Sequence, residues 1–308
     1  MPSSKRLFKD VAMRIGSLLF VIAAALCALA PSVHSAERLA RITNETPWLC
    51  YYGDDRRVLD VPGYELLILE SEGLGDLSPD DKAGRLCVAY MSVGEAESGR
   101  WYYPDIQDKP WVLDVNPDWP ESRLVDVRSP EWRALIIDSV AAYIMAAGYD
   151  GFILDNVDTA EALLEEDDVV YDGADTAMAE LIRGLRGKYP DAVIIANGGL
   201  DIVPAVADCI DAMMYEGTIS TWHYDGDGEL GYGEIGPQDK AWLRPRLLRV
   251  KNAGVPVLAL EYVDPDDPTA KKQVWEEVLR AGNNPCISVR ELDVFPGSDD
   301  LPEAEEND

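Results

Sequence analysis

GYDGFILDNVD, at residues 148–158, joins a helix to a strand and the strand to an acidic residue. Gly148 is typical of the position just beyond a helix, and Gly151–Leu154 is predicted to be a buried strand. Asp155 follows that strand directly. A helix that leads into an almost wholly apolar strand is the repeating unit of a parallel sheet covered on both faces.

The same kind of strand recurs along the chain. Short apolar runs bounded by turn residues predict eight strands. They are residues 48–52, 66–69, 86–91, 151–154, 192–196, 212–215, 255–260 and 286–289.

Helical patterns lie between these runs. The clearest begins with Ser129 as N-cap and Pro130 in the first turn, and it ends at Gly148. Apolar residues at three- and four-residue steps predict its buried face. They are Trp132, Leu135, Ile136, Val140, Tyr143, Ile144 and Ala147. Three further helices are predicted at 175–188, with Asp175 as a possible N-cap, at 237–252 and at 268–281.

Eight buried strands alternating with helices predict an α/β fold, a single-domain (β/α)8 TIM barrel over residues 37–296. An open doubly wound sheet is the alternative. We find no internal repeat and no linker long enough to separate two domains.

The two ends of the chain are predicted to lie outside this domain. Four basic residues precede the apolar run 15–30, and small residues follow it, as in a secretory signal peptide over residues 1–36. An uncleaved anchor is the alternative, although the run is short for a bilayer. We therefore expect a secreted or periplasmic protein with no stable membrane anchor after cleavage. Residues 297–308 are predicted to be an acidic disordered tail.

Composition excludes several classes of function. Lys and Arg total 27 against 57 Asp and Glu, for a formal charge of -30, so nucleic acid is a poor partner. The whole chain has two His, which excludes chemistry built on several imidazoles. Cys50, Cys87, Cys209 and Cys286 remain after the signal, and the sequence leaves open whether they are disulfides or buried thiols.

Acidic residues stand at or just beyond the ends of several predicted strands: Glu70, Glu95, Asp155, Glu216 and Glu261. In a barrel these positions share one rim, where active sites lie. Paired carboxylates are what glycoside hydrolysis needs, since one protonates the leaving oxygen while the other attacks the sugar or activates water. A divalent-metal site is the alternative use of such a set.

Residues 148–158 also carry a resemblance. They are similar to the GfDGvflDnvD signature of glycoside hydrolase family 114, the endo-α-1,4-polygalactosaminidase-like enzymes. The segments YYG at 51–53, AYMSVGEAE at 89–97 and LEY at 260–262 resemble further motifs of that family, in its order. The segment MMYEGT at 213–218 and ANGG at 196–199 depart from the family pattern. The fold is therefore expected to carry over more firmly than the substrate.

The resemblance implies a secreted barrel that cuts α-1,4-linked galactosamine chains, with catalytic carboxylates after the fourth and sixth strands. These fall at Asp155 and Glu216, with Asp155 as nucleophile or base and Glu216 as proton donor, or the reverse. Asp158 would orient Asp155 or bind a sugar hydroxyl. No cofactor or metal is expected, and the partner is a polysaccharide, expected to be a cationic amino-sugar polymer.

The remaining predicted substrate-binding residues are Tyr52, Glu95, Asn197, Tyr215, Trp222, Glu261 and Tyr262, and Trp101 and Tyr102 are further candidate stacking platforms. The sequence leaves the stereochemistry open. A glycan-binding barrel without catalysis is the alternative function.

Overall fold

The computed structural model describes residues 41–224 and 228–296. The predicted signal peptide, residues 1–36, and the predicted acidic tail, residues 297–308, lie outside the described residues. Contacts divide the chain into units of residues 1–41 and 42–308, and the fold described below is that of the second unit. Within the described ranges, no helix combines the length and the apolar composition needed to cross a membrane.

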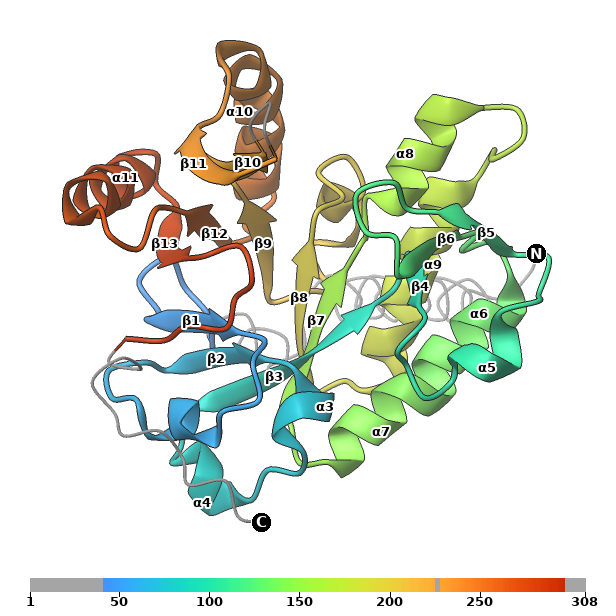
Figure 1. Cartoon of the computed structure of the whole chain (residues 1–308). Coiled ribbons are helices and arrows are strands. Elements are labelled where there is room, and N and C mark those ends of the chain that lie inside the picture. The colour runs from blue at the N-terminus through green and yellow to red at the C-terminus, as the bar shows by residue number, and fades with distance from the viewer. Residues whose placement is uncertain (1–40, 225–227, 297–308) are drawn as a thin grey trace, which may run out of the picture. The chain divides into compact units, whose positions relative to one another are not determined.

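Eight parallel strands form one sheet, in which they lie side by side in the order in which they occur along the chain (Figure 1). An open doubly wound sheet would reverse this order part-way, so that alternative is wrong and the predicted (β/α)8 barrel is confirmed. The strands are β1 (Trp48–Tyr51), β2 (Leu66–Leu69), β3 (Leu86–Ser92), β7 (Gly151–Asp155), β8 (Val193–Asn197), β9 (Ala212–Glu216), β12 (Val257–Tyr262) and β13 (Asn284–Ser288).

The seam between β1 and β13 is held by side chains. Among the described residues no backbone ladder joins these two strands. Trp48 Nε1 instead donates to the carbonyl of Asn284 at 3.2 Å, and Asn284 Nδ2 donates to the carbonyl of Thr46 at 2.7 Å. The barrel is therefore nearly closed, with two side chains in place of the last ladder.

The strands are buried on both faces. Every residue of β2 and of β12 is buried, because one face of each strand lines the barrel interior and the other is covered by helices. This double burial explains why the strands are continuous apolar runs in the sequence rather than alternating ones.

The predicted helix after Ser129 consists of α6 (Pro130–Leu135), a π-helical turn η2 (Ile136–Val140) and α7 (Ala141–Ala146). The Ser129 hydroxyl accepts from the backbone N–H of Trp132, which confirms the predicted N-cap. A π turn inserts one extra residue and rotates the face that follows. Tyr143, predicted on the buried face, is for this reason 44% exposed, and that prediction is wrong.

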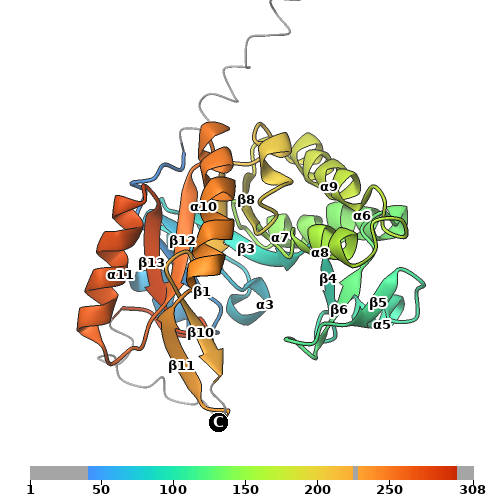
Figure 2. The ribbon, with the colours of Figure 1, turned by 90° about the horizontal axis from the view of Figure 1, so that it is seen from above.

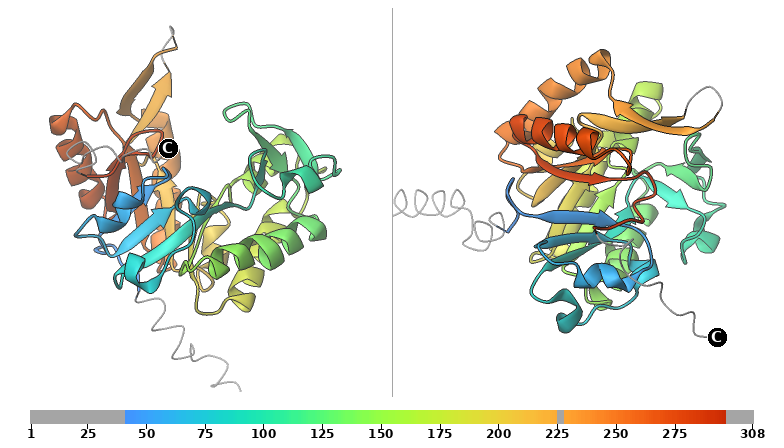
Figure 3. Two further views of the ribbon diagram at one scale, coloured as in Figure 1. Left: turned by 60° about the horizontal axis from the view of Figure 1, so that its bottom comes forward. Right: turned by 60° about the vertical axis from the view of Figure 1, so that its left-hand side comes forward.

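The other long helices also lie on the outside of the sheet (Figures 2 and 3). Helix α9 (Ala174–Lys188) has Gly173 as its N-cap, with a φ of +80° that favours glycine, so the prediction of Asp175 as N-cap is wrong. The remaining helices are α8 (Thr159–Glu166), α10 (Pro237–Asn252) and α11 (Pro268–Arg280), with the short α3 (Ser71–Leu74), α4 (Pro79–Lys82), α5 (Tyr103–Ile106), η1 (Arg56–Asp60) and η3 (Val203–Val206).

Two antiparallel excursions follow strands of the barrel and were not predicted. After β3 the chain forms a small sheet of β4 (Glu95–Glu97), β5 (Val112–Val115) and β6 (Ser122–Val125). After β9 it forms the hairpin of β10 (Ser220–Tyr224) and β11 (Leu230–Glu234). Both excursions leave the barrel at the carboxyl ends of its strands.

The four cysteines of the barrel are free thiols. Cys50, Cys87, Cys209 and Cys286 are all buried, and none forms a disulfide. Burial, the largest cause, raises the pKa of the Cys286 thiol to about 12 and that of Cys87 to about 11. These side chains are therefore neutral packing groups, which decides the question that the sequence left open.

Candidate active site

Four polar residues stand at the carboxyl ends of four strands of the barrel. Asp155 ends β7, Asn197 ends β8, Glu216 ends β9 and Tyr262 ends β12. Parallel strands of a barrel bring these ends to one rim. Side chains that are far apart in the sequence therefore meet there.

Asn197 lies between the two predicted catalytic acids and bonds to both. Its Nδ2 donates to Asp155 Oδ1 at 2.8 Å and to Glu216 Oε1 at 2.8 Å. The two N–H bonds of an amide diverge by about 120°, so these two carboxylate oxygens lie about 5 Å apart. Tyr262 Oη donates to the other oxygen of Glu216 at 2.5 Å. Both acids thus face one another with a fixed spacing.

Asp155 is the more shielded of the two acids. Tyr90 Oη lies 2.9 Å from its Oδ2, and the backbone N–H of Asn156 donates to its Oδ1 at 2.9 Å. Burial and then the charge of Glu216 raise the pKa of Asp155 to about 7, and the charge of Asp158 adds to this. The hydrogen bonds from Tyr90 and Asn156 act in the opposite direction. Glu216, in contrast, is exposed.

A left-handed residue turns the chain directly after Asp155. Asn156 has a φ of +60°, and its Oδ1 accepts from the Ser92 hydroxyl at 2.7 Å. A Cβ on Gly94 would lie 2.1 Å from the carbonyl oxygen of Asn156, so only glycine fits at that position. Asparagine tolerates the left-handed region better than most residues. These contacts keep Asp155 at the rim and aim its carboxylate at Asn197.

Asp158 is exposed beside this pair, at the start of α8. Desolvation by the surrounding chain, the largest cause, raises the pKa of Asp158 to about 6, and the charges of Glu216 and Glu95 contribute. A Cβ on Gly198 would lie 2.8 Å from Asp158 Cγ, so glycine is what lets the carboxylate lie here. No hydrogen bond between described residues joins Asp158 to Asp155. It acts on Asp155 through its charge, and contact with substrate stays a prediction.

A comparison with protein families finds a matching family model. The model of the glycoside-hydrolase family GH114 matches residues 68–299, which is more than half of the chain. The chain belongs to family GH114. Relatives of this GH114 chain include an uncharacterized protein of Methanocaldococcus jannaschii, 31% identical over 69% of this chain and 64% of that one. Another, from Deinococcus radiodurans, is 28% identical over 68% of this chain and 66% of that one. The chain thus spans about two thirds of the length of these relatives.

Solved structures share the fold of the GH114 chain. The glycoside hydrolase domain of PelA from Pseudomonas aeruginosa superposes with a TM-score of 0.69, at 24% identity, over 81% of this chain and 96% of that one. Ega3 of Aspergillus fumigatus, solved in complex with galactosamine, gives a TM-score of 0.60 at 18% identity, over 82% and 94% of the two chains. At these identities the likeness shows a common barrel.

Two of the acids predicted to contact substrate are buried in this GH114 chain instead. Glu261 is 0% exposed, and its carboxylate accepts from the backbone after β9. Glu95 is 4% exposed and accepts from Ser122 Oγ at 2.6 Å and Asn116 Nδ2 at 2.9 Å. Both oxygens of each carboxylate accept from donors of the chain itself, and contact of either acid with substrate stays a prediction. Each acid fixes a loop at the rim.

Asn197 and Tyr262 were also predicted to line subsites. Both are buried, and their polar groups are bonded to Asp155 and Glu216 as described above. Their place is therefore beside the acids, where they orient the carboxylates.

The predicted stacking aromatics lie at several separate locations. Tyr52 packs edge-on against Tyr90 near Asp155, with ring centroids 5.1 Å apart. Tyr215 precedes Glu216 on β9 and therefore points to the opposite face of the sheet. Trp222, on the hairpin, packs edge-on against Trp119 of the β5–β6 loop, with ring centroids 6.3 Å apart. Tyr102 is buried and Trp101 is half exposed, so the prediction of a stacking platform at Tyr102 is wrong.

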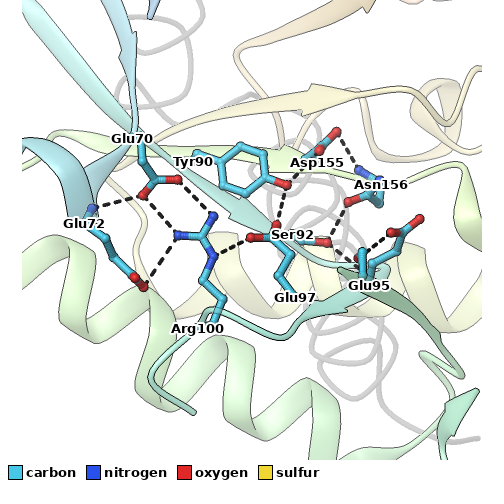
Figure 4. Close-up of polar contacts among 10 residues, drawn as sticks. Glu70, Glu72, Tyr90, Ser92, Glu95, Glu97, Arg100, Asp155 and Asn156 are labelled. Atoms are coloured by element: carbon cyan, nitrogen blue, oxygen red, sulfur yellow. Dashed lines mark hydrogen bonds and ion pairs between the residues drawn. The ribbon is translucent and has the colours of Figure 1, made fainter. Parts of the chain in front are cut away.

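Three residues near Asp155 were given no role from the sequence: Tyr90, Glu97 and Arg100. Figure 4 shows them as a chain of contacts that reaches Asp155. The segment 89–97, which resembles a family motif, contains Tyr90 and Glu97, but it does not indicate that they reach Asp155, and Arg100 is a basic residue in a turn. Only the fold brings them to the same acid.

Proposed function

We propose that this chain hydrolyses an α-1,4-linked galactosamine-type polysaccharide, with Asp155 and Glu216 as its catalytic pair. The observation that carries the proposal is the Asn197 amide, which bonds to both carboxylates and spaces their nearest oxygens by about 5 Å. Membership of a glycoside-hydrolase family supports it.

The spacing favours a mechanism with retention of configuration. Carboxyl groups about 5–5.5 Å apart are typical of retaining glycosidases, whereas inverting enzymes need about 6.5–9.5 Å to admit a water molecule. Asp155 is held by three hydrogen-bond partners, Tyr90, Asn156 and Asn197, and suits the nucleophile, which must not move. Glu216 is exposed and suits the acid and base, since that group must reach both the leaving oxygen and water.

Two displacements follow from these roles. In the first, an oxygen of Asp155 forms a bond to the anomeric carbon, the glycosidic C–O bond breaks, and Glu216 gives its proton to the leaving oxygen. In the second, Glu216 takes a proton from water, the water oxygen bonds to the anomeric carbon, and Asp155 leaves as a carboxylate.

The reaction requires one proton on the pair. With the pKa of Asp155 raised to about 7 by burial and by the charge of Glu216, the two acids together retain a proton up to about that pH. Loss of this proton leaves no group to protonate the leaving oxygen. We therefore expect kcat/KM to fall as the pH rises through about 7.

Two observations support an amino sugar as substrate. The formal charge of -30 would attract a polycation, and the fold is shared with Ega3, which was solved with galactosamine. Added salt screens such long-range attraction, so kcat/KM on a cationic polymer is expected to fall as ionic strength rises. A rate independent of salt would contradict the steering argument.

We further infer that the protein acts outside the cytoplasm. The basic residues followed by the apolar run at 15–30 support export. Sequencing the amino terminus of protein recovered from the producing cells tests this, and a mature chain that still begins at Met1 would contradict it.

The decisive experiment is product analysis on a de-N-acetylated α-1,4-galactosamine polymer. We expect the wild-type chain to release oligosaccharides, and we expect Asp155→Asn and Glu216→Gln to lose turnover by several orders of magnitude. Glu276→Gln, an exposed acid of α11, is the matched control and should retain full activity. Near-normal turnover in either catalytic variant would refute the assigned pair.

Two further readouts separate the parts of the proposal. Proton NMR of the first product formed should show the α-anomer, and a β-anomer would remove Asp155 as nucleophile. Binding of the polymer by the wild-type chain without release of oligosaccharides would instead establish the alternative, a glycan-binding barrel.

A further inference from the structure

Tyr90 lies between two carboxyl groups (Figure 4). Its hydroxyl oxygen is 2.9 Å from Asp155 Oδ2 and 2.6 Å from Glu97 Oε1, both hydrogen-bond distances. A phenol carries one proton and can donate it to one acceptor at a time. Burial and the charges of Asp155 and Glu97 raise the pKa of Tyr90 well above its usual range, so the phenol is not ionised and its proton remains shared among Tyr90, Asp155 and Glu97.

Because Tyr90 can donate to only one of the two carboxylates, the other contact lacks a hydrogen-bond proton. If both acids were ionised, one carboxylate oxygen would face the phenol oxygen without a hydrogen between them. The contact is satisfied when one of the acids keeps its own proton and donates it to Tyr90, while Tyr90 donates to the other acid.

Arg100 makes the two acids unequal, because it bonds to Glu97. Its Nε donates to Glu97 Oε2 at 2.5 Å, and its guanidinium lies 5.1 Å from the centre of the Tyr90 ring. The other two nitrogens bond to both oxygens of Glu70, at 3.0 and 2.9 Å. The guanidinium thus gives Glu97 a charge-assisted hydrogen bond in addition to its contact with Tyr90. Asp155 has no cation in the corresponding position among the described residues, and is the acid that keeps a proton.

We propose that Glu97 is a positioning residue that competes with Asp155 for the single proton of Tyr90, and so keeps Asp155 protonated in the free enzyme. This inference rests on the proposed function, because it concerns the acid that we assign as nucleophile, which must pass this proton to Glu216 before it attacks as a carboxylate. Glu97 acts on Asp155 through the hydroxyl of Tyr90, which contacts both acids, and Arg100 bonds to Glu97 on the side away from Tyr90.

Other groups also face Asp155 and act on it directly. They are Cys50 and Tyr52 near β1, Tyr90 on β3, Asp158 before α8, Glu216 on β9 and Tyr262 on β12, with Glu97 and Arg100 beyond Tyr90. A test must therefore separate the path through Tyr90 from the general effect of removing a negative charge. Glu72 provides that control, since it lies 3.5 Å from Arg100 but makes no bond to Tyr90.

The experiment is a titration of the Asp155 side-chain carboxyl by 13C NMR, with the signal assigned by its loss in Asp155→Asn. In Glu97→Gln the phenol proton is released to Asp155, which stabilises the carboxylate, so the titration midpoint should move about one pH unit lower. In Tyr90→Phe the acceptor of the Asp155 proton and the path to Glu97 are both lost, so the midpoint should also move lower. Glu72→Gln should leave the midpoint within about 0.2 units of wild type.

The alkaline limb of the kcat/KM profile should move in the same directions, which a merely structural role of Glu97 would not produce. Equal midpoints in Glu97→Gln and Glu72→Gln, or a rise in Glu97→Gln, would overturn the inference. If Glu97→Gln does not fold, a midpoint in Tyr90→Phe at or above that of wild type overturns it alone. Expected NMR shifts in a chain that releases no oligosaccharides would refute the proposed function and support the coupling.

Discussion

Glu261→Gln tests how a buried acid holds the loop that carries Glu216. The Glu261 carboxylate is wholly buried on β12 and accepts four hydrogen bonds from residues 218–220. The backbone N–H groups of Thr218, Ile219 and Ser220 donate at 3.1, 3.0 and 2.8 Å, and the Thr218 hydroxyl also donates. Burial, the largest cause, raises the pKa of Glu261, and these four donors oppose it.

The cost of the substitution follows from counting acceptors. Glutamine offers one oxygen, so the two donors that now bond to the other oxygen would face an NH2 group. Each buried donor left unsatisfied costs about 1–3 kcal/mol, whereas loss of the buried charge recovers part of its desolvation cost. We expect the free energy of unfolding to fall by about 3 kcal/mol, which is a large part of the ~5–15 kcal/mol typical of a domain.

Urea denaturation followed by far-UV circular dichroism measures this difference, with an unchanged m-value as the check that the same transition is compared. Glu276→Gln on the exposed face of α11 is the matched control and should stay within about 0.5 kcal/mol of wild type. Because the loop begins directly after Glu216, kcat should also fall in Glu261→Gln under conditions where it is folded. A Glu261→Gln variant within about 0.5 kcal/mol of wild type would refute the acceptor count.

Three further predictions use the same structure. The pKa values of Asp155 and Asp158 are raised to about 7 and 6, mainly by desolvation, so between about pH 4 and 7 the folded state binds protons that the unfolded state releases. The free energy of unfolding should therefore fall as the pH rises through this window, and a Tm higher at pH 8 than at pH 5 would contradict this. Tyr262→Phe removes a donor to Glu216 and should lower kcat by about 10- to 100-fold with little change in Tm, whereas a change below about twofold would count against the role of that bond. Trp119→Ala removes the contact between the β5–β6 loop and the hairpin and should raise KM for the polymer severalfold with kcat nearly unchanged; an unaltered KM would exclude the loop from substrate binding.

The barrel was predictable because its strands have a simple physical signature. Strands buried on both faces must be apolar throughout, and the eight runs found in the sequence are the eight strands of the sheet. The acids that end β7 and β9 were predictable for the same reason, since an apolar strand that stops at Asp155 or Glu216 marks its own carboxyl end.

The environment of each acid was not predictable in the same way. Glu216 and Glu261 both occur at the ends of apolar runs, yet one is exposed and the other is enclosed by donors about 40 residues earlier in the chain. The excursion after β3 likewise supplies the partners of Glu95 from residues 116 and 122. Contacts across such distances depend on how loops fold back, which strand periodicity does not encode.

The number of hydrogen-bond donors around an acid distinguishes an acid that fixes a loop, such as Glu261, from one of the proposed catalytic pair, such as Asp155. Glu261 has four donors to itself, so its charge can be satisfied in full and its effect is to fix a loop. Asp155 shares the Asn197 amide with Glu216 and the Tyr90 hydroxyl with Glu97. Shared donors leave more acceptor oxygens than protons, and a buried site can correct that shortage by keeping a proton on a carboxyl group. Cleavage requires the proton on Glu216 beside an ionised Asp155, so the proton that this shortage of donors keeps on Asp155 in the free enzyme has to pass to Glu216 before the glycosidic bond is broken.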